Sequence, residues 1–131
     1  MIQLIGLFVC LIGLESPAHS LDDNEAQLLR GQELYQSNCF MCHGTSGRGD
    51  GPAARAVSGS PPRNFVQEDF KYGSSPEDIF QTITKGVTGT VMPSWKHLSE
   101  EDRKALSHYV LNFRKGQDRS AASSPQGSAG K

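Results

Sequence analysis

The chain has 131 residues and a formal net charge of −1 at pH 7. This length has room for one small domain rather than two. The near-neutral charge argues against nucleic acid as a partner and against strong binding to anionic membrane surfaces.

The first predicted segment is apolar. Residues 1–14, MIQLIGLFVCLIGL, are almost continuously hydrophobic, a length that fits the core of a signal peptide and is too short to cross a bilayer as a helix. Ala18 and Ser20 suit cleavage after Ser20. No Lys or Arg precedes Arg30, which is unusual for a signal, and a buried N-terminal helix is the alternative. We predict a signal peptide over residues 1–20 and a periplasmic or otherwise extracytoplasmic protein.

The first helix is predicted over residues 24–37. Apolar side chains recur there with a loose helical period, at Leu28, Leu29, Leu34 and Tyr35. Gly31 lies in the middle of this helix and costs about 1 kcal/mol relative to alanine. A glycine at such a position suggests that another element crosses closely at this point.

Two cysteines and a histidine follow this helix in the segment NCFMCHG. A dithiol switch of the thioredoxin kind needs a βαβ setting, and a structural zinc needs about four ligands, which only His97 or His108 could complete. C-x-x-C-H is the attachment signature of a c-type haem. In that case Cys39 and Cys42 form thioethers with the haem vinyl groups, and His43 is the proximal iron ligand. The motif favours one covalently attached haem c.

Residues 44–71 form a long segment rich in glycine and proline. Irregular loops of this length are uncommon in a compact domain, but such a loop becomes reasonable if it wraps a large rigid group. The second helix is predicted in SSPEDIFQTITKG. Ser75 suits the N-cap, Pro76 the first turn and Gly86 the stop.

The sixth iron ligand is predicted by elimination. Met1 leaves with the signal peptide, and Met41 lies inside the attachment motif on the proximal side. Met92 remains, in GTVMPSW between the second and third helices, where the following proline disfavours helix. A methionine that fills a gap in the core is the alternative, and His97 or His108 would then be the ligand. We predict that Met92 binds the iron.

The third helix is predicted to begin after Ser99 and to end at Gly116. Its apolar residues repeat at helical spacing, at Leu106, Tyr109, Val110 and Phe113. Residues 117–131 hold no large apolar side chain and are predicted to be disordered. The folded domain is therefore expected over residues 21–116. No alternating pattern persists long enough for a sheet, so the expected class is all-α.

These motifs resemble those of small mono-haem class I cytochromes c, particularly bacterial ones. The resemblance covers about residues 26–113 and includes, in the order of the family, GRGDGPAA, PPRNF, ITKGVTGTVMPSW and LSEEDRKALSHYVLNF. It implies a cytochrome c-like fold of about three main helices, with long Gly/Pro-rich loops around one haem. It also implies that the first and last helices cross, with Gly31 near Tyr109 or Phe113, and that the haem edge is exposed.

The resemblance further implies contacts around the haem. A carbonyl of Pro61 or Pro62 would accept the Nδ1 proton of His43, which would fix the orientation of the imidazole. Arg63, Asn64 and Trp95 would contact the haem propionates.

His/Met ligation raises the reduction potential of haem iron and fills both axial positions. We therefore expect a one-electron carrier and not an enzyme. It would be a monomer that docks transiently with extracytoplasmic or membrane-bound redox proteins, without strong membrane binding once the signal is cleaved. An electron-entry subunit of a larger respiratory or dehydrogenase complex is the alternative. A further alternative is a haem enzyme or gas sensor with an open sixth coordination site.

Overall fold

The computed structural model describes residues 22–123, with side chains described over residues 22–116. The elements in chain order are α1 (Asp23–Asn38), α2 (Phe40–His43), the 3-10 turn η1 (Ala54–Ala56), α3 (Pro76–Lys85) and α4 (Glu100–Ser123). No strand occurs within the described residues, and the predicted all-α class is confirmed. The predicted signal peptide and the tail from residue 124 onwards lie outside the described residues.

The helix starts follow from capping side chains. The carboxylate of Asp22 accepts the N–H of Glu25 at 2.7 Å and begins α1. Ser75 caps α3 as predicted: its hydroxyl accepts the N–H of Asp78, and the Asp78 carboxylate accepts the N–H of Ser75, both at 3.1 Å. Such reciprocal bonds satisfy backbone donors that a helix start would otherwise leave free. No described helix combines the length and hydrophobicity that a membrane span requires.

The end of α4 corrects a prediction. The helix passes through Gly116 and continues to Ser123, so the first part of the predicted disordered tail is helical. One glycine costs a helix only about 1 kcal/mol. The residues after it include good helix formers, and no proline follows before Pro125. The predicted stop at Gly116 therefore fails because propagation of an existing helix outweighs this cost.

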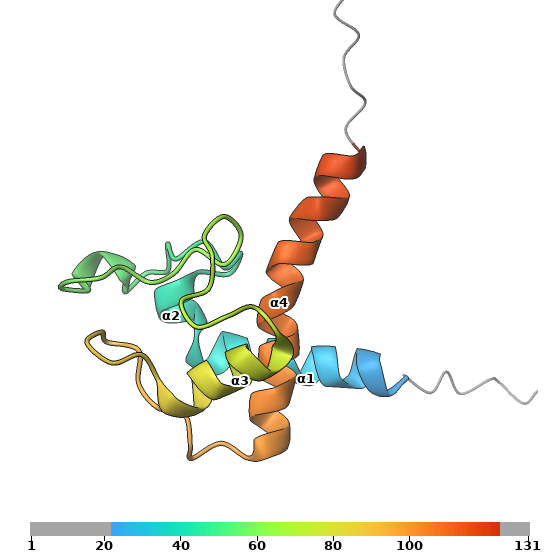
Figure 1. Cartoon of the computed structure of the whole chain (residues 1–131), viewed down its shortest axis with the longest axis horizontal. Coiled ribbons are helices and arrows are strands. Elements are labelled where there is room, and N and C mark those ends of the chain that lie inside the picture. The colour runs from blue at the N-terminus through green and yellow to red at the C-terminus, as the bar shows by residue number, and fades with distance from the viewer. Residues whose placement is uncertain (1–21, 124–131) are drawn as a thin grey trace, which may run out of the picture.

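The central packing contact is the crossing of α1 and α4 (Figure 1). Gly31 lies at the crossing, where an added Cβ would come within 2.7 Å of the Cβ of Tyr109 and would collide with the Ala105 carbonyl. The lack of a side chain at Gly31 allows the two backbones to approach closely. The predicted reason for this glycine is therefore confirmed.

An ion pair joins the same two helices at the surface. The guanidinium of Arg30 donates to both carboxylate oxygens of Asp102, from Nε at 2.8 Å and from an Nη atom at 3.1 Å. These hydrogen bonds lower the pKa of Asp102 below its usual value. A two-pronged arginine–carboxylate pair fixes geometry better than a single contact does.

The long loop after α2 is hydrogen-bonded to that short helix. Backbone N–H groups of Gly49, Gly51 and Ala53 donate to the carbonyls of His43, Cys42 and Met41, at 2.9, 3.1 and 2.8 Å. The loop thus satisfies the acceptors that the end of a helix leaves open. The fully buried Tyr35 adds a bond from its hydroxyl to the Gly44 carbonyl at 2.6 Å.

We expect Gly31→Ala to lower the stability of the full chain. Alanine would gain about 1 kcal/mol in helix propensity, but overpacking typically costs 1–3 kcal/mol, and here the obstacle is backbone. Urea unfolding measures the difference. Gly116→Ala is the matched control, because among the described residues outside its own helix backbone no atom lies within 4 Å of a Cβ added there. Equal midpoints for the two variants would contradict the close crossing.

We expect the free energy of unfolding of Asp102→Asn to depend less on pH in the acid range than that of the parent. The pKa of Asp102 is lower in the folded state than in the unfolded state. The ionised carboxylate therefore stabilises the fold at any pH above the usual carboxyl pKa, and this stabilisation is lost as the pH falls through the folded pKa. The variant should be less stable than the parent at pH 7 and should lose less stability between about pH 5 and pH 3. Urea unfolding across this range measures both, with Glu101→Gln as the neighbouring control. Parallel pH profiles for parent and Asp102→Asn would contradict the role of the ion pair.

Candidate functional site

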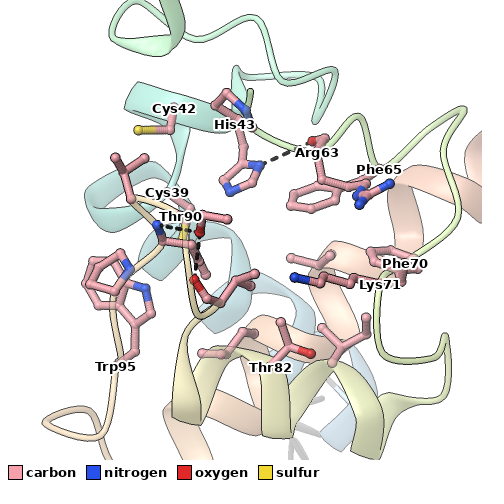
Figure 2. A pocket seen from close by; sticks show the side chains of 18 of the residues that line it. Cys39, Cys42, His43, Arg63, Phe65, Phe70, Lys71, Thr82, Thr90 and Trp95 are labelled. Carbon is pink, nitrogen blue, oxygen red and sulfur yellow. Dashed lines mark hydrogen bonds between the residues drawn. The ribbon is translucent and has the colours of Figure 1, made fainter. Parts of the chain in front are cut away.

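One cavity of about 360 Å³ lies between α1, α3, α4 and the loops, and most of its lining side chains are apolar. Figure 2 shows Cys42 and His43 on one side of it and Thr82 of α3 on the opposite side. The predicted anchoring residues Cys39, Cys42, His43 and Met92 all line this cavity. Residues from α2, from the residue before it and from the α3–α4 connection thus meet at one place.

The short helix α2 explains how the attachment motif presents its side chains. The N–H of His43 donates to the Cys39 carbonyl at 3.0 Å, so these residues lie one helical turn apart. Side chains three and four positions apart share a helix face, which places both thiols and the imidazole together. Gly44 ends the turn, with a positive φ of 77°.

His43 is buried, and its ring points into the cavity (Figure 2). The ring stacks on Phe65, with 4.4 Å between the centroids. Its Nδ1 lies 3.3 Å from the backbone oxygen of Arg63. A proton on Nδ1 donates to that oxygen and leaves a lone pair on Nε2. Burial lowers the pKa of His43, partly opposed by the bond to Arg63, and thus favours the neutral ring that a metal ligand requires.

The acceptor corrects the prediction that Pro61 or Pro62 bonds to His43. Both prolines line the cavity, but the Pro62 carbonyl packs on Gly49, where an added Cβ would lie 3.1 Å from the carbonyl carbon. The next carbonyl, that of Arg63, faces His43 instead. Two dihedral angles at one residue decide which carbonyl turns inward, and a sequence motif does not specify them.

The two alternative chemistries of the motif find no support. Cys39 and Cys42 are free thiols. Burial raises the pKa of the Cys39 thiol to about 12, and Cys42 adds to the rise, so Cys39 is not a reactive thiolate at neutral pH. Across residues 22–123, no three His, Cys, Asp or Glu side chains gather into a metal site. Neither His97 nor His108 therefore completes a zinc site.

Met92 lines the cavity from the connection between α3 and α4. A tight turn holds it: its carbonyl accepts the N–H of Val87, and its own N–H donates to Thr90 Oγ1, both at 3.1 Å. Within the part of the chain that the structure describes, His97 and His108 do not line the cavity. Of the predicted sixth ligands, only Met92 reaches the cavity. Its bond to iron stays a prediction.

Trp95 provides a test of whether a haem fits this cavity. It lines the cavity, and its Nε1–H is buried without a hydrogen-bond partner among the described residues. An unsatisfied buried donor costs about 1–3 kcal/mol, which an acceptor in the cavity would remove. A haem carries two propionate carboxylates, either of which could accept the N–H of Trp95. The anchoring residues around one apolar cavity also fit this group.

The other two residues that were predicted to contact the propionates, Arg63 and Asn64, differ in their position relative to the cavity. Arg63 lines the cavity, and its guanidinium pairs with Glu68 at 3.0 Å. Asn64 is not among the residues that line it. Its Oδ1 accepts the N–H groups of Val66 and Gln67 at 3.0 and 3.2 Å. This side chain stabilises the turn that follows, and its contact with a propionate stays a prediction.

Two residues at the site were not predicted from the sequence. Phe65 supports the flat side of the His43 ring, and Thr90 holds the backbone of Met92 through its hydroxyl. An aromatic residue directly after PPRN was the available signal for Phe65. Nothing in the local sequence singles out Thr90, because its role depends on the shape of the turn.

Comparisons with known proteins give the family. The matching family model, described as cytochrome C oxidase, cbb3-type, subunit III, covers residues 26–110. The Cbb3-type cytochrome c oxidase subunit CcoP of Azospirillum brasilense is 38% identical over 85 residues, which make up 64% of this chain and 28% of that protein. The subunit FixP of Azorhizobium caulinodans is 38% identical over 89 residues, or 67% of this chain and 28% of that protein. The chain thus spans less than a third of the length of these curated relatives.

A solved structure is also similar to this chain. A chain of the Kuenenia stuttgartiensis reducing HAO-like protein complex superimposes with a TM-score of 0.63 and 41% identity, over 69% of this chain and 44% of that one. The resemblance and the cytochrome c-like fold are confirmed at the level of the cytochrome c family. The finer placement among small mono-haem class I cytochromes stays a prediction. The chain belongs to the cytochrome c oxidase, cbb3-type, subunit III family, whose cytochrome c domain carries a covalently bound c-type haem with its iron.

Proposed function

We propose that this chain is a haem c electron-transfer domain that works as an electron-entry subunit of a larger extracytoplasmic redox complex. The observation that carries the proposal is the meeting of Cys39, Cys42, His43 and Met92 around one apolar cavity. A cytochrome c domain of this family carries electrons and is not itself catalytic.

Each anchoring residue has a distinct task in this proposal. Cys39 and Cys42 would hold the haem through thioethers, and His43 and Met92 would bind its iron. When bound, the c-type haem supplies an iron centre that exchanges one electron. The bond from His43 to Arg63 orients the imidazole and increases its strength as a donor. The apolar wall of the cavity would keep water away from the metal.

The subunit assignment is supported by the relatives. Two of them are named as subunits of cbb3-type oxidases, and the similar solved chain belongs to a protein complex. The free shuttle remains the second candidate, because the structure draws all four anchoring residues from this one chain. Under either candidate, we propose an exported protein whose residues 1–20 act as signal or anchor, with redox proteins as its partners.

We expect Met92→Ala to open the sixth coordination position of the haem-loaded protein. The parent should give sharp low-spin bands when reduced and a weak near-infrared charge-transfer band when oxidised. The variant should lose that band and bind carbon monoxide, and its reduction potential should fall, because methionine ligation raises the potential. Visible and near-infrared spectra in both oxidation states measure this.

Met41→Ala is the matched control. Met41 is 47% exposed and is not among the residues that line the cavity. The spectrum of the Met41→Ala protein should therefore match that of the parent. A low-spin spectrum unchanged by Met92→Ala would exclude Met92 as ligand. A parent chain that attaches no haem in a host able to attach it would overturn the proposed function.

We expect the tagged full chain, purified from its native host in mild detergent, to retain a redox protein in fixed stoichiometry. Native mass and the haem spectrum of the purified material measure this. A stable assembly would support the subunit. A solitary haem-loaded monomer would favour the free shuttle and contradict the subunit proposal.

A further inference from the structure

Lys71 lines the cavity and, as Figure 2 shows, points into it from the side of Phe70. The other lysine or arginine on the described cavity wall is Arg63, which Glu68 already neutralises at 3.0 Å. Among the described residues, no carboxylate forms an ion pair with Lys71. Its ammonium lies 5.1 Å from the centroid of the Tyr72 ring, a contact that attracts a cation without neutralising it.

The residues before Lys71 are fixed in place. The carboxylate of Asp69 accepts a hydrogen bond from Arg114 of α4 at 2.8 Å. The same guanidinium lies 5.6 Å from the ring centroid of Phe70, and Phe70 stacks on Phe65 with 5.7 Å between the centroids. The segment that leads to Lys71 is therefore attached to α4 through Arg114 and to the cavity wall through Phe70.

A cation directed into an apolar cavity is stabilised when the occupant brings a negative charge. The haem of the proposed function brings two carboxylates. We propose that Lys71 pairs with a propionate carboxylate of the haem and raises the reduction potential of the iron. This inference rests on the proposed haem site. A positive charge beside the haem favours the reduced state, which carries one positive charge fewer than the oxidised state.

The test measures the reduction potential of the haem-loaded full chain by spectroelectrochemistry, in low and in high salt. Lys71→Gln should lower the equilibrium constant for reduction about threefold to tenfold, or about 30 to 60 mV by the one-electron relation. The difference should shrink in high salt, because Lys71 is exposed enough to be screened. Lys71→Arg keeps the charge and should restore the parent potential.

Lys96→Gln is the matched control, since Lys96 is exposed and is not among the residues that line the cavity. Equal potentials in Lys71→Gln and Lys96→Gln, with normal haem spectra, would overturn the role of Lys71 and leave the proposed function intact. A lost near-infrared band in Lys71→Gln would also overturn it, because the substitution would then act on the bond between Met92 and iron instead of on a carboxylate. A parent chain without haem would overturn both.

Discussion

The close crossing of α1 and α4 determines where the site can form. Gly31 brings the two backbones together, and the Arg30–Asp102 pair holds them at the surface. Because α2 follows α1 after a single residue, the crossing also sets the position of both thiols and of the imidazole. The side of the cavity that carries the C-x-x-C-H segment is thus an extension of the packing between the first and last helices.

The other side of the cavity depends on shorter-range contacts. Hydroxyl groups, capping bonds and one arginine hold the loops: Thr90 fixes Met92, Ser75 fixes the start of α3, and Arg114 fixes the segment before Lys71. Such irregular segments are ordered by individual hydrogen bonds rather than by a repeating pattern. The cavity therefore has one wall made of crossing helices and another made of separately anchored loops.

This division explains what the sequence could predict. Residues whose place depends on helical spacing were predictable: the C-x-x-C-H motif puts Cys39, Cys42 and His43 on one face, and Gly31 marks the crossing. Positions that depend on loop dihedrals were not. The acceptor for His43 is Arg63 rather than a proline, and Asn64 is occupied by its own turn. The end of α4 was misjudged because a single glycine opposes a helix only weakly.

The α1–α4 contact also has a consequence for the order of folding. Gly31 meets Ala105 and Tyr109, residues that lie far along the chain, and contacts between distant residues form slowly because a long loop must close first. The core cannot close until α4 has been synthesised. Until then the C-x-x-C-H segment is not enclosed by the completed core. The same contact that shapes the finished cavity therefore leaves a period in which a large, rigid group can reach both cysteines before the last helix docks.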